Sequence, residues 1–194
     1  MPRTLDPAKL NPTKMDALLA LKRRETLDQE RIISMIPLRP YHVVADIGCG
    51  PGYFAIPLAK YINQGKLYAM DTKEEMLEAC RQRLTEVHLT NIEVLHCGPK
   101  KLPLDKDTLD GAFMAFVLHE IKDKKSVLAA VKRSLQKGGW FALIEWYKQA
   151  IDEGPPLEDR VSEEEARELG ENAGLRFVSQ RDLNGKNYLM LFRK

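Results

Sequence analysis

The chain has 194 residues, of which 44% are hydrophobic and 30% charged, and its basic and acidic side chains leave a net charge of +2. This composition predicts one globular domain with a core of its own and argues against a dedicated nucleic-acid-binding protein. No apolar run is long enough to span a membrane, and the N-terminus carries no apolar signal region, so we expect a cytoplasmic protein. Three cysteines without metal-ligand spacing, Cys49, Cys80 and Cys97, predict no metal site and no disulfide framework.

Residues 1–40 are expected to form a helical segment that packs on the sheet or over a pocket mouth, ahead of a core at 41–194 in the same domain. The spacing of apolar side chains predicts one helix at 13–24 and a second with Asp28 as its N-cap. The basic run at 22–24 is interpreted as a solvated face, with contact to an anionic substrate as the alternative.

The rest of the chain is organised around residues 43–52, VVADIGCGPG. The apolar start, Val43–Ile47, predicts a buried parallel strand. Gly48, Gly50 and Gly52 follow at alternate positions, and a helical pattern begins directly after them. A strand, a glycine loop and a helix in this order form the nucleoside- or phosphate-binding corner of an α/β sheet. The spacing G-x-G-x-G differs from the dinucleotide pattern G-x-G-x-x-G and favours a ligand without a pyrophosphate.

Strands and helices are then expected to alternate until a closing hairpin. Further strands are predicted at 66–71, 92–96, 109–117, 140–146, 175–179 and 188–192, and helices at 53–62, 73–88, 123–136 and 162–173. Thr72 and Glu75 have capping-box spacing, Gly138 is the expected helix end, and Asn184-Gly185 is typical of a hairpin turn. This alternation predicts a parallel sheet to which the hairpin adds an antiparallel strand. The segment 149–160 is expected to be a surface loop or lid.

Asp71 ends the second expected strand, about twenty residues beyond the glycine loop. A carboxylate placed there can accept hydrogen bonds from ribose hydroxyls, which would also suit NAD. The glycine spacing and the closing hairpin both depart from the dinucleotide-binding pattern.

With these features together, the sequence resembles the class I S-adenosylmethionine-dependent methyltransferases, and within them the small-molecule group like the ubiquinone and menaquinone biosynthesis enzymes (methyltransferase type 11). The resemblance covers roughly residues 27–194. The matching motifs are DIGCGPG at 46–52, AMD at 69–71, LPL at 102–104 with LDGA at 109–112, and LQKGG at 135–139.

The resemblance implies an α/β, Rossmann-like seven-stranded sheet of order 3-2-1-4-5-7-6, with strand 7 antiparallel and helices on both faces. It implies that the glycine loop lines the methionine end of S-adenosylmethionine, that Asp46 lies near the amino group and that Asp71 holds the ribose. The expected cofactor-binding residues are Asp46, Gly48, Cys49, Gly50, Gly52, Tyr53, Asp71, Thr72, Met76, Gly98, Ala115 and Phe116. The family often has an acidic residue near the adenine, where this chain has Cys97-Gly98-Pro99.

Methyl transfer from a sulfonium mainly requires alignment of the reactants and exclusion of water, and a base only where the acceptor loses a proton. His119 follows the fourth expected strand, where α/β active sites lie. It is a candidate base or substrate donor; the alternative is a histidine that bonds the backbone and shapes the loop. Glu145 either bonds backbone or contacts substrate, and Tyr53 either lies near the transferred methyl or is a packing ring.

We therefore predict S-adenosylmethionine-dependent methyl transfer to a small or medium organic acceptor. The alternatives are a non-catalytic S-adenosylmethionine-binding protein and a nicotinamide-dependent oxidoreductase, with a metalloid methyltransferase ranked below them. No Asn-Pro-Pro-Tyr-type run follows the fourth strand, so amino-group methylation of nucleic acid is not favoured. The expected partner is thus a small molecule, and the sequence predicts neither the acceptor atom nor the oligomeric state.

Overall fold

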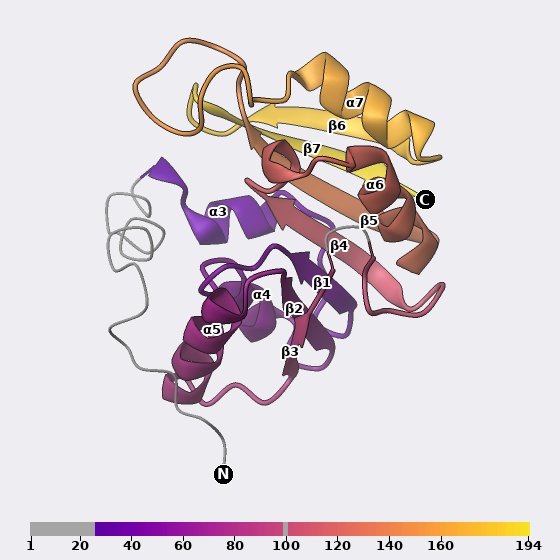
Figure 1. Cartoon of the computed structure of the whole chain (residues 1–194). Coiled ribbons are helices and arrows are strands. Elements are labelled where there is room, and N and C mark those ends of the chain that lie inside the picture. The colour runs from indigo at the N-terminus through magenta and orange to yellow at the C-terminus, as the bar shows by residue number, and fades with distance from the viewer. Residues whose placement is uncertain (1–25, 99–100) are drawn as a thin grey trace.

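The computed structural model describes residues 26–98 and 101–194, so the expected helix at 13–24 and the basic run at 22–24 lie outside the described residues. A seven-stranded sheet of order β3-β2-β1-β4-β5-β7-β6 forms the centre of the molecule (Figure 1). Strand β7 is antiparallel to β5 and β6, and the other neighbouring strands are parallel. The predicted strand order is confirmed. The strands are β1 (Val43–Ile47), β2 (Lys66–Asp71), β3 (Ile92–His96), β4 (Leu109–Ala115), β5 (Leu135–Trp146), β6 (Arg176–Asp182) and β7 (Asn187–Arg193).

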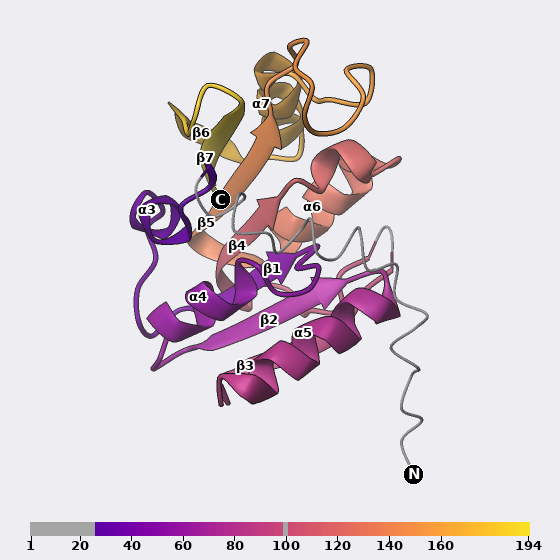
Figure 2. The ribbon, with the colours of Figure 1, turned by 90° about the vertical axis from the view of Figure 1, so that its left-hand side faces the viewer.

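Helices cover both faces of this sheet (Figure 2). Successive strand residues point to opposite faces, so Val44 belongs to the apolar cluster on the face of α3, α4 and α5, whereas Ala45 belongs to the cluster on the face of α6 and α7. Each face thereby buries its own apolar cluster. The helices are α3 (Gln29–Ser34), α4 (Ala55–Tyr61), α5 (Glu74–Glu86), the short 3-10 turn η2 (Leu118–Glu120), α6 (Lys124–Ser134) and α7 (Glu163–Asn172).

Several element ends follow the local sequence signals. The Asp28 carboxylate accepts hydrogen bonds from the amides of Glu30 and Arg31 and caps α3. Ser162 caps α7 in the same way. Gly185 has a φ of +73° in the β6–β7 turn, which confirms the hairpin predicted there.

The start of α5 differs from the prediction. Lys73, not Thr72, is its N-cap, and no side chain caps it. Asp71 Oδ1 instead accepts a hydrogen bond from the Lys73 amide at 2.9 Å. The strand-end carboxylate therefore takes the place of the expected capping box.

The junction of α6 and β5 also differs. The helix ends at Ser134 rather than at Gly138, because Leu135 has extended backbone and pairs with Leu109 of β4. Gly138, with a φ of +80°, lies inside β5 at an irregularity of the pairing, and its amide bonds the Lys194 carbonyl. Pairing with β4 thus overrides a local helix-ending signal.

Strand β4 ends at Ala115, two residues earlier than predicted, because Phe116 adopts a φ of +61°. Within residues 26–98 and 101–194, no helix combines the length and the apolar character that crossing a membrane would need.

Candidate cofactor and acceptor site

A cavity of about 480 Å³ opens at the carboxyl ends of β1, β2 and β4. β1 and β4 are neighbours in the sheet. The connection that follows β1 leads to β2 on one side, whereas the connection that follows β4 leads to β5 on the other. Such a switch point is where open α/β sheets bind ligands. The lining residues are Asp46, Ile47, Gly48, Cys49, Gly50, Pro51, Tyr53, Phe54, Asp71, Thr72, Lys73, Met76, Cys97, Gly98, Leu102, Ala115, Phe116, Val117, Glu120, Ile121, Lys122, Asp123 and Val127.

Most of the predicted site residues lie around this cavity. It is lined by Asp46, Gly48, Cys49, Gly50, Tyr53, Asp71, Thr72, Met76, Gly98, Ala115 and Phe116. Gly52 and His119 are not among the lining residues. Gly52 faces α5 instead, since a Cβ added to it would lie 3.0 Å from Cys80 Sγ. Gly52 therefore allows the loop and the helix to pack closely.

The glycine loop is folded back onto the end of β2. The amides of Gly48 and Cys49 both donate to the Met70 carbonyl, at 2.7 and 2.9 Å. Gly48 and Gly50 have positive φ, at +74° and +53°. A Cβ on Gly48 would lie 2.2 Å from Val117 Cγ2, whereas one on Gly50 would meet nothing within 4 Å. Gly48 is thus required for close packing, and Gly50 leaves open space at the cavity.

Asp71 connects the loop to the start of α5. Its Oδ2 accepts a hydrogen bond from the Gly50 amide at 3.0 Å, and its Oδ1 accepts one from the Lys73 amide. An ionised carboxylate has about four acceptor positions, so each oxygen retains one for a ligand hydroxyl. This arrangement is compatible with the ribose contact expected of Asp71.

Asp46 is the most unusual polar group in the cavity wall. Its side chain is 2% exposed, and Oδ2 has no hydrogen-bond partner in the described part of the chain. Burial, followed by the negative charge of Asp71, raises the pKa of Asp46 to about 8. An unpartnered buried carboxylate beside a cavity is suited to bind a cationic group. The amino group of S-adenosylmethionine is such a cation, so the residues present fit this cofactor.

Phe116 in the cavity wall packs against Trp146, which is not itself a lining residue. The centroids of the two rings lie 5.5 Å apart. The backbone of Phe116 is left-handed, and its amide donates a 2.8 Å hydrogen bond to the Ile144 carbonyl. A non-glycine residue with this φ stores strain, which is found most often at functional sites.

The charged residues at the cavity include an ion pair across its wall. Lys73 Nζ and a Glu120 carboxylate oxygen lie 3.7 Å apart, and both side chains are largely exposed. Glu120 lies in η2 and lines the cavity.

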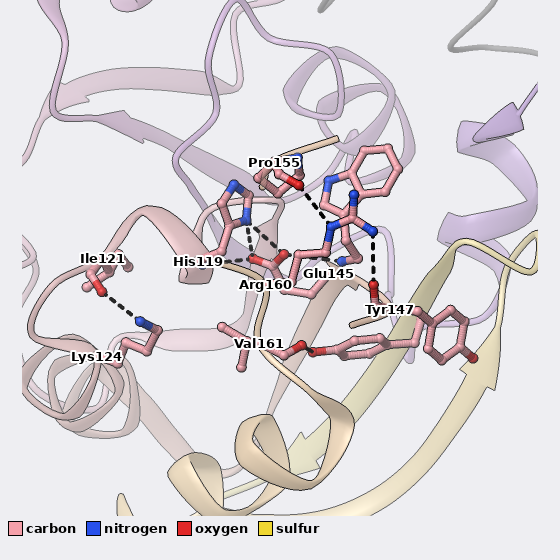
Figure 3. Close-up of polar contacts among 10 residues, drawn as sticks. His119, Ile121, Lys124, Glu145, Tyr147, Pro155, Arg160 and Val161 are labelled. Atoms are coloured by element: carbon pink, nitrogen blue, oxygen red, sulfur yellow. Dashed lines mark hydrogen bonds and ion pairs between the residues drawn. The ribbon is translucent and has the colours of Figure 1, made fainter. Parts of the chain in front are cut away.

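His119 contacts the carboxylate of Glu145 (Figure 3). His119 Nδ1 lies 2.9 Å from Glu145 Oε2 and 3.1 Å from Oε1, and Glu145 also accepts hydrogen bonds from the amides of His119 and Trp146. Burial lowers the pKa of His119, but the hydrogen bond to Glu145 and the nearby carboxylates outweigh it, so the net shift is upward. Of the two roles expected for Glu145, the structure therefore shows the contact with backbone amides. Glu145 also contacts the His119 side chain.

Arg160 is a residue that the sequence analysis missed. Its guanidinium is buried and donates to four carbonyls, those of Tyr147, Gln149, Glu153 and Pro155, as Figure 3 shows in part. It also lies 5.7 Å from the centre of the Trp146 ring. Arg160 thus holds the predicted loop at 149–160 next to Trp146. No sequence signal indicated this role, because its partners are backbone atoms.

Tyr53 and the cysteines have packing positions. The Tyr53 hydroxyl donates to the Leu27 carbonyl at 3.0 Å, and its ring packs edge-on against Phe54, so it attaches the segment before α3 to the loop. All three cysteines are buried. A hydrogen bond with Cys80 and then burial raise the pKa of Cys49, and burial raises that of Cys97 to about 11. In residues 26–98 and 101–194 no group of three or more His, Cys, Asp or Glu side chains could hold a metal ion.

Comparison with known proteins assigns the chain to a family. A family model described as a methyltransferase domain matches residues 45–143, half of the chain, including the glycine loop, Asp71 and β4. The chain belongs to the S-adenosylmethionine-dependent methyltransferases. A crystal structure of an S-adenosylmethionine-dependent methyltransferase from Aquifex aeolicus is 32% identical, with a TM-score of 0.89 over 95% of this chain and 99% of that one. S-adenosylmethionine is the cofactor of this family.

More distant relatives differ in what their names describe. Demethylmenaquinone methyltransferases of Bacillus cereus and Listeria monocytogenes are 26% and 28% identical over 68% and 71% of this chain. The chain spans 55% and 59% of the length of these two relatives. The [4+2]-cyclase SpnF shares the methyltransferase fold at 15% identity, with a TM-score of 0.76 over 86% of this chain and 80% of that one. That likeness concerns the fold alone, so the acceptor must be argued from this site.

Proposed function

We propose that this protein transfers a methyl group from S-adenosylmethionine to a small organic acceptor. The observation that carries the proposal is the buried, unpartnered carboxylate of Asp46 in the wall of a cavity next to the glycine loop. A ligand without a donor group would leave Asp46 Oδ2 without a hydrogen-bonding partner, which is costly, and a cationic donor compensates it most strongly. A cationic amino acid group at Asp46 and a ribose at Asp71 together satisfy both carboxylates.

When bound, the cofactor supplies an electrophilic methyl group on a positively charged sulfur. The chain's own residues position the reactants. Asp46 and the glycine loop hold the amino acid end, Asp71 holds the sugar, and Thr72, Met76 and Leu102 surround the adenosine with apolar and backbone contacts. Phe116, supported by Trp146, bounds the acceptor side and excludes water, which favours reaction by proximity and desolvation.

An aromatic acceptor is favoured within this proposal. The support is the ring of Phe116 in the cavity wall, against which a planar acceptor can stack, and the name of the relatives, demethylmenaquinone methyltransferases. Because the chain spans little more than half of those relatives, the acceptor is proposed as an aromatic molecule of this general kind rather than as demethylmenaquinone itself.

Calorimetry with S-adenosylmethionine and with its demethylated product tests cofactor binding. We expect both to bind to the wild type with dissociation constants of micromolar order, and Asp46→Asn to weaken binding at least tenfold. Absence of binding by either compound would refute the proposal. A thermal-shift comparison with NAD distinguishes the nicotinamide-dependent alternative, since only the true cofactor should raise the melting temperature.

A second experiment separates catalysis from cofactor binding alone. A metabolite extract is incubated with cofactor carrying a labelled methyl group, and the products are analysed by mass spectrometry. We expect a labelled aromatic product that is absent with Asp46→Asn. Tight cofactor binding without any labelled product would favour the non-catalytic alternative.

A further inference from the structure

The pair formed by His119 and Glu145 has a geometry that cofactor binding does not use. Glu145 is fully buried on β5, and both of its oxygens contact His119 Nδ1, at 3.1 and 2.9 Å. The same carboxylate accepts hydrogen bonds from the amides of His119 and Trp146, at 3.2 and 3.3 Å. Four contacts therefore hold the carboxylate and the imidazole in one orientation.

This orientation determines which ring nitrogen is available. A carboxylate is only an acceptor, so the neutral imidazole must carry its proton on Nδ1, and the lone pair is on Nε2. Figure 3 shows the ring standing over the Glu145 carboxylate, so that Nε2 is directed away from it. His119 itself does not line the cofactor cavity, but Val117, which precedes η2, and Glu120, which follows His119, both do. His119 is thus held next to the cavity with its basic nitrogen free of the carboxylate that orients it.

We propose that His119 takes the proton from a methyl acceptor that loses an O–H, N–H or C–H proton on methylation, and that Glu145 is the positioning residue of this base. The inference rests on the proposed function and narrows its acceptor to molecules with a proton to lose. In the reaction, the acceptor's electron pair forms the bond to the methyl carbon. The carbon–sulfur bond breaks, its electrons stay on sulfur, and the acceptor's proton passes to Nε2. The imidazolium then releases this proton to water.

The charges around His119 suit this role. Glu145 contacts it from β5, and the charges of Glu120 in η2 and of Asp159 in the loop before α7 also act on it. Burial lowers the pKa of His119, while Glu145, Glu120 and Asp159 raise it, and the net direction is upward. A base with a raised pKa accepts a proton more readily, although it is available only above that pKa. Activity should therefore rise with pH through the pKa of His119.

Two kinds of acceptor and a matched histidine variant test the proposal with the full chain. The hydroxylated probes are catechol and 1,4-naphthohydroquinone, and quinoline is an aromatic acceptor with no proton to lose. With labelled cofactor, we expect the hydroxylated probes to be methylated by the wild type, and His119→Asn to lower kcat by 100-fold or more. His88→Asn changes an exposed histidine with a φ of +53°, which asparagine tolerates, and should leave kcat unchanged.

Glu145→Gln separates positioning from mere structural support. The amides of His119 and Trp146 donate to different oxygens of Glu145, so the single oxygen of a glutamine can keep only one of these two bonds. The NH₂ group at the other position donates to Nδ1 and moves the imidazole proton to Nε2. We expect kcat to fall at least tenfold, the pH inflection of kcat/KM to move to lower pH, and the cofactor dissociation constant to stay within about twofold. Added imidazole should restore part of the activity of His119→Gly.

Other outcomes would overturn the inference. One is methylation of quinoline in preference to the hydroxylated probes. Another is an unchanged kcat or pH profile in both His119→Asn and Glu145→Gln. A third is a wild type that binds cofactor but methylates neither hydroxylated probe. Failure of the proposed function is distinct, because it appears as a wild type that binds neither S-adenosylmethionine nor its demethylated product.

Discussion

The carboxylates of Asp46 and Asp71 share the wall of one cavity, and the negative charge of Asp71 helps to raise the pKa of Asp46 to about 8. Burial is the larger cause. Asp46 lies in β1 and Asp71 ends the neighbouring strand β2, so the sheet itself brings the two groups together. The cavity therefore contains one carboxyl group that is largely protonated at neutral pH until a cation binds beside it.

Cofactor binding should consequently release a proton at neutral pH. The amino group of the cofactor stabilises the ionised form of Asp46, so the pKa of Asp46 falls on binding. We expect affinity to increase between pH 6 and pH 8 and to level off above that range. Calorimetry in buffers with different ionisation enthalpies measures the proton release. Asp71→Asn should move the release to lower pH, since it removes a charge that raises the pKa of Asp46, and an affinity independent of pH in the wild type would contradict the assignment.

The same group should make stability depend on pH without cofactor. The folded pKa of Asp46, about 8, lies above its usual value in an unfolded chain, so the folded state holds the proton more tightly. Stability from this source is present at low pH and is lost as the pH rises from about 4 to 8, by at most about 1.4 kcal/mol per pH unit. Urea unfolding of the wild type at pH 5 to 8 should show this loss. His119 contributes in the same direction, so the difference from Asp46→Asn isolates Asp46, and parallel curves for the two proteins would argue against it.

Much of the fold could be predicted because its signals are local. The apolar run Val43–Ile47, the glycines after it and Asn184-Gly185 each determine backbone geometry through their own side chains, or the lack of one. The α6–β5 junction could not be predicted in this way. Gly138 has the local character of a helix end, but the pairing of Leu135 with Leu109 depends on a strand far away in sequence.

The cofactor half of the candidate site was more predictable than the acceptor half, for a related reason. Asp46 and Asp71 stand next to strand ends whose positions the hydrophobic pattern indicates. The left-handed backbone of Phe116 has no signature, since phenylalanine is not a residue that favours this conformation. The link between His119 and Glu145 joins two elements that only the folded sheet brings into contact.

The glycine loop offers two substitutions with different expected effects. Gly48→Ala should destabilise the fold by about 3 kcal/mol, because its Cβ would overlap Val117 and its φ is positive. Val117→Ala should recover part of this loss. Gly50→Ala meets open space, so it should cost only about 1 kcal/mol of backbone strain while its methyl group weakens cofactor binding at least tenfold. Urea unfolding and calorimetry measure the two effects, and equal stability losses would show that the loop packs differently.

Arg160 should stabilise the loop that precedes α7. Arg160→Met leaves four backbone carbonyls without their charged donor, so we expect a loss of about 2–4 kcal/mol in unfolding free energy and a mobile segment at 149–160. A protease specific for glutamate, with sites at Glu153 and Glu158, should then cleave the variant faster than the wild type. Arg160→Lys should lie between the two, because it retains the charge but not the planar set of donors. The control is Arg176→Met, at an exposed position of β6. If Arg160→Met were cleaved no faster than this control, the anchoring role would be contradicted.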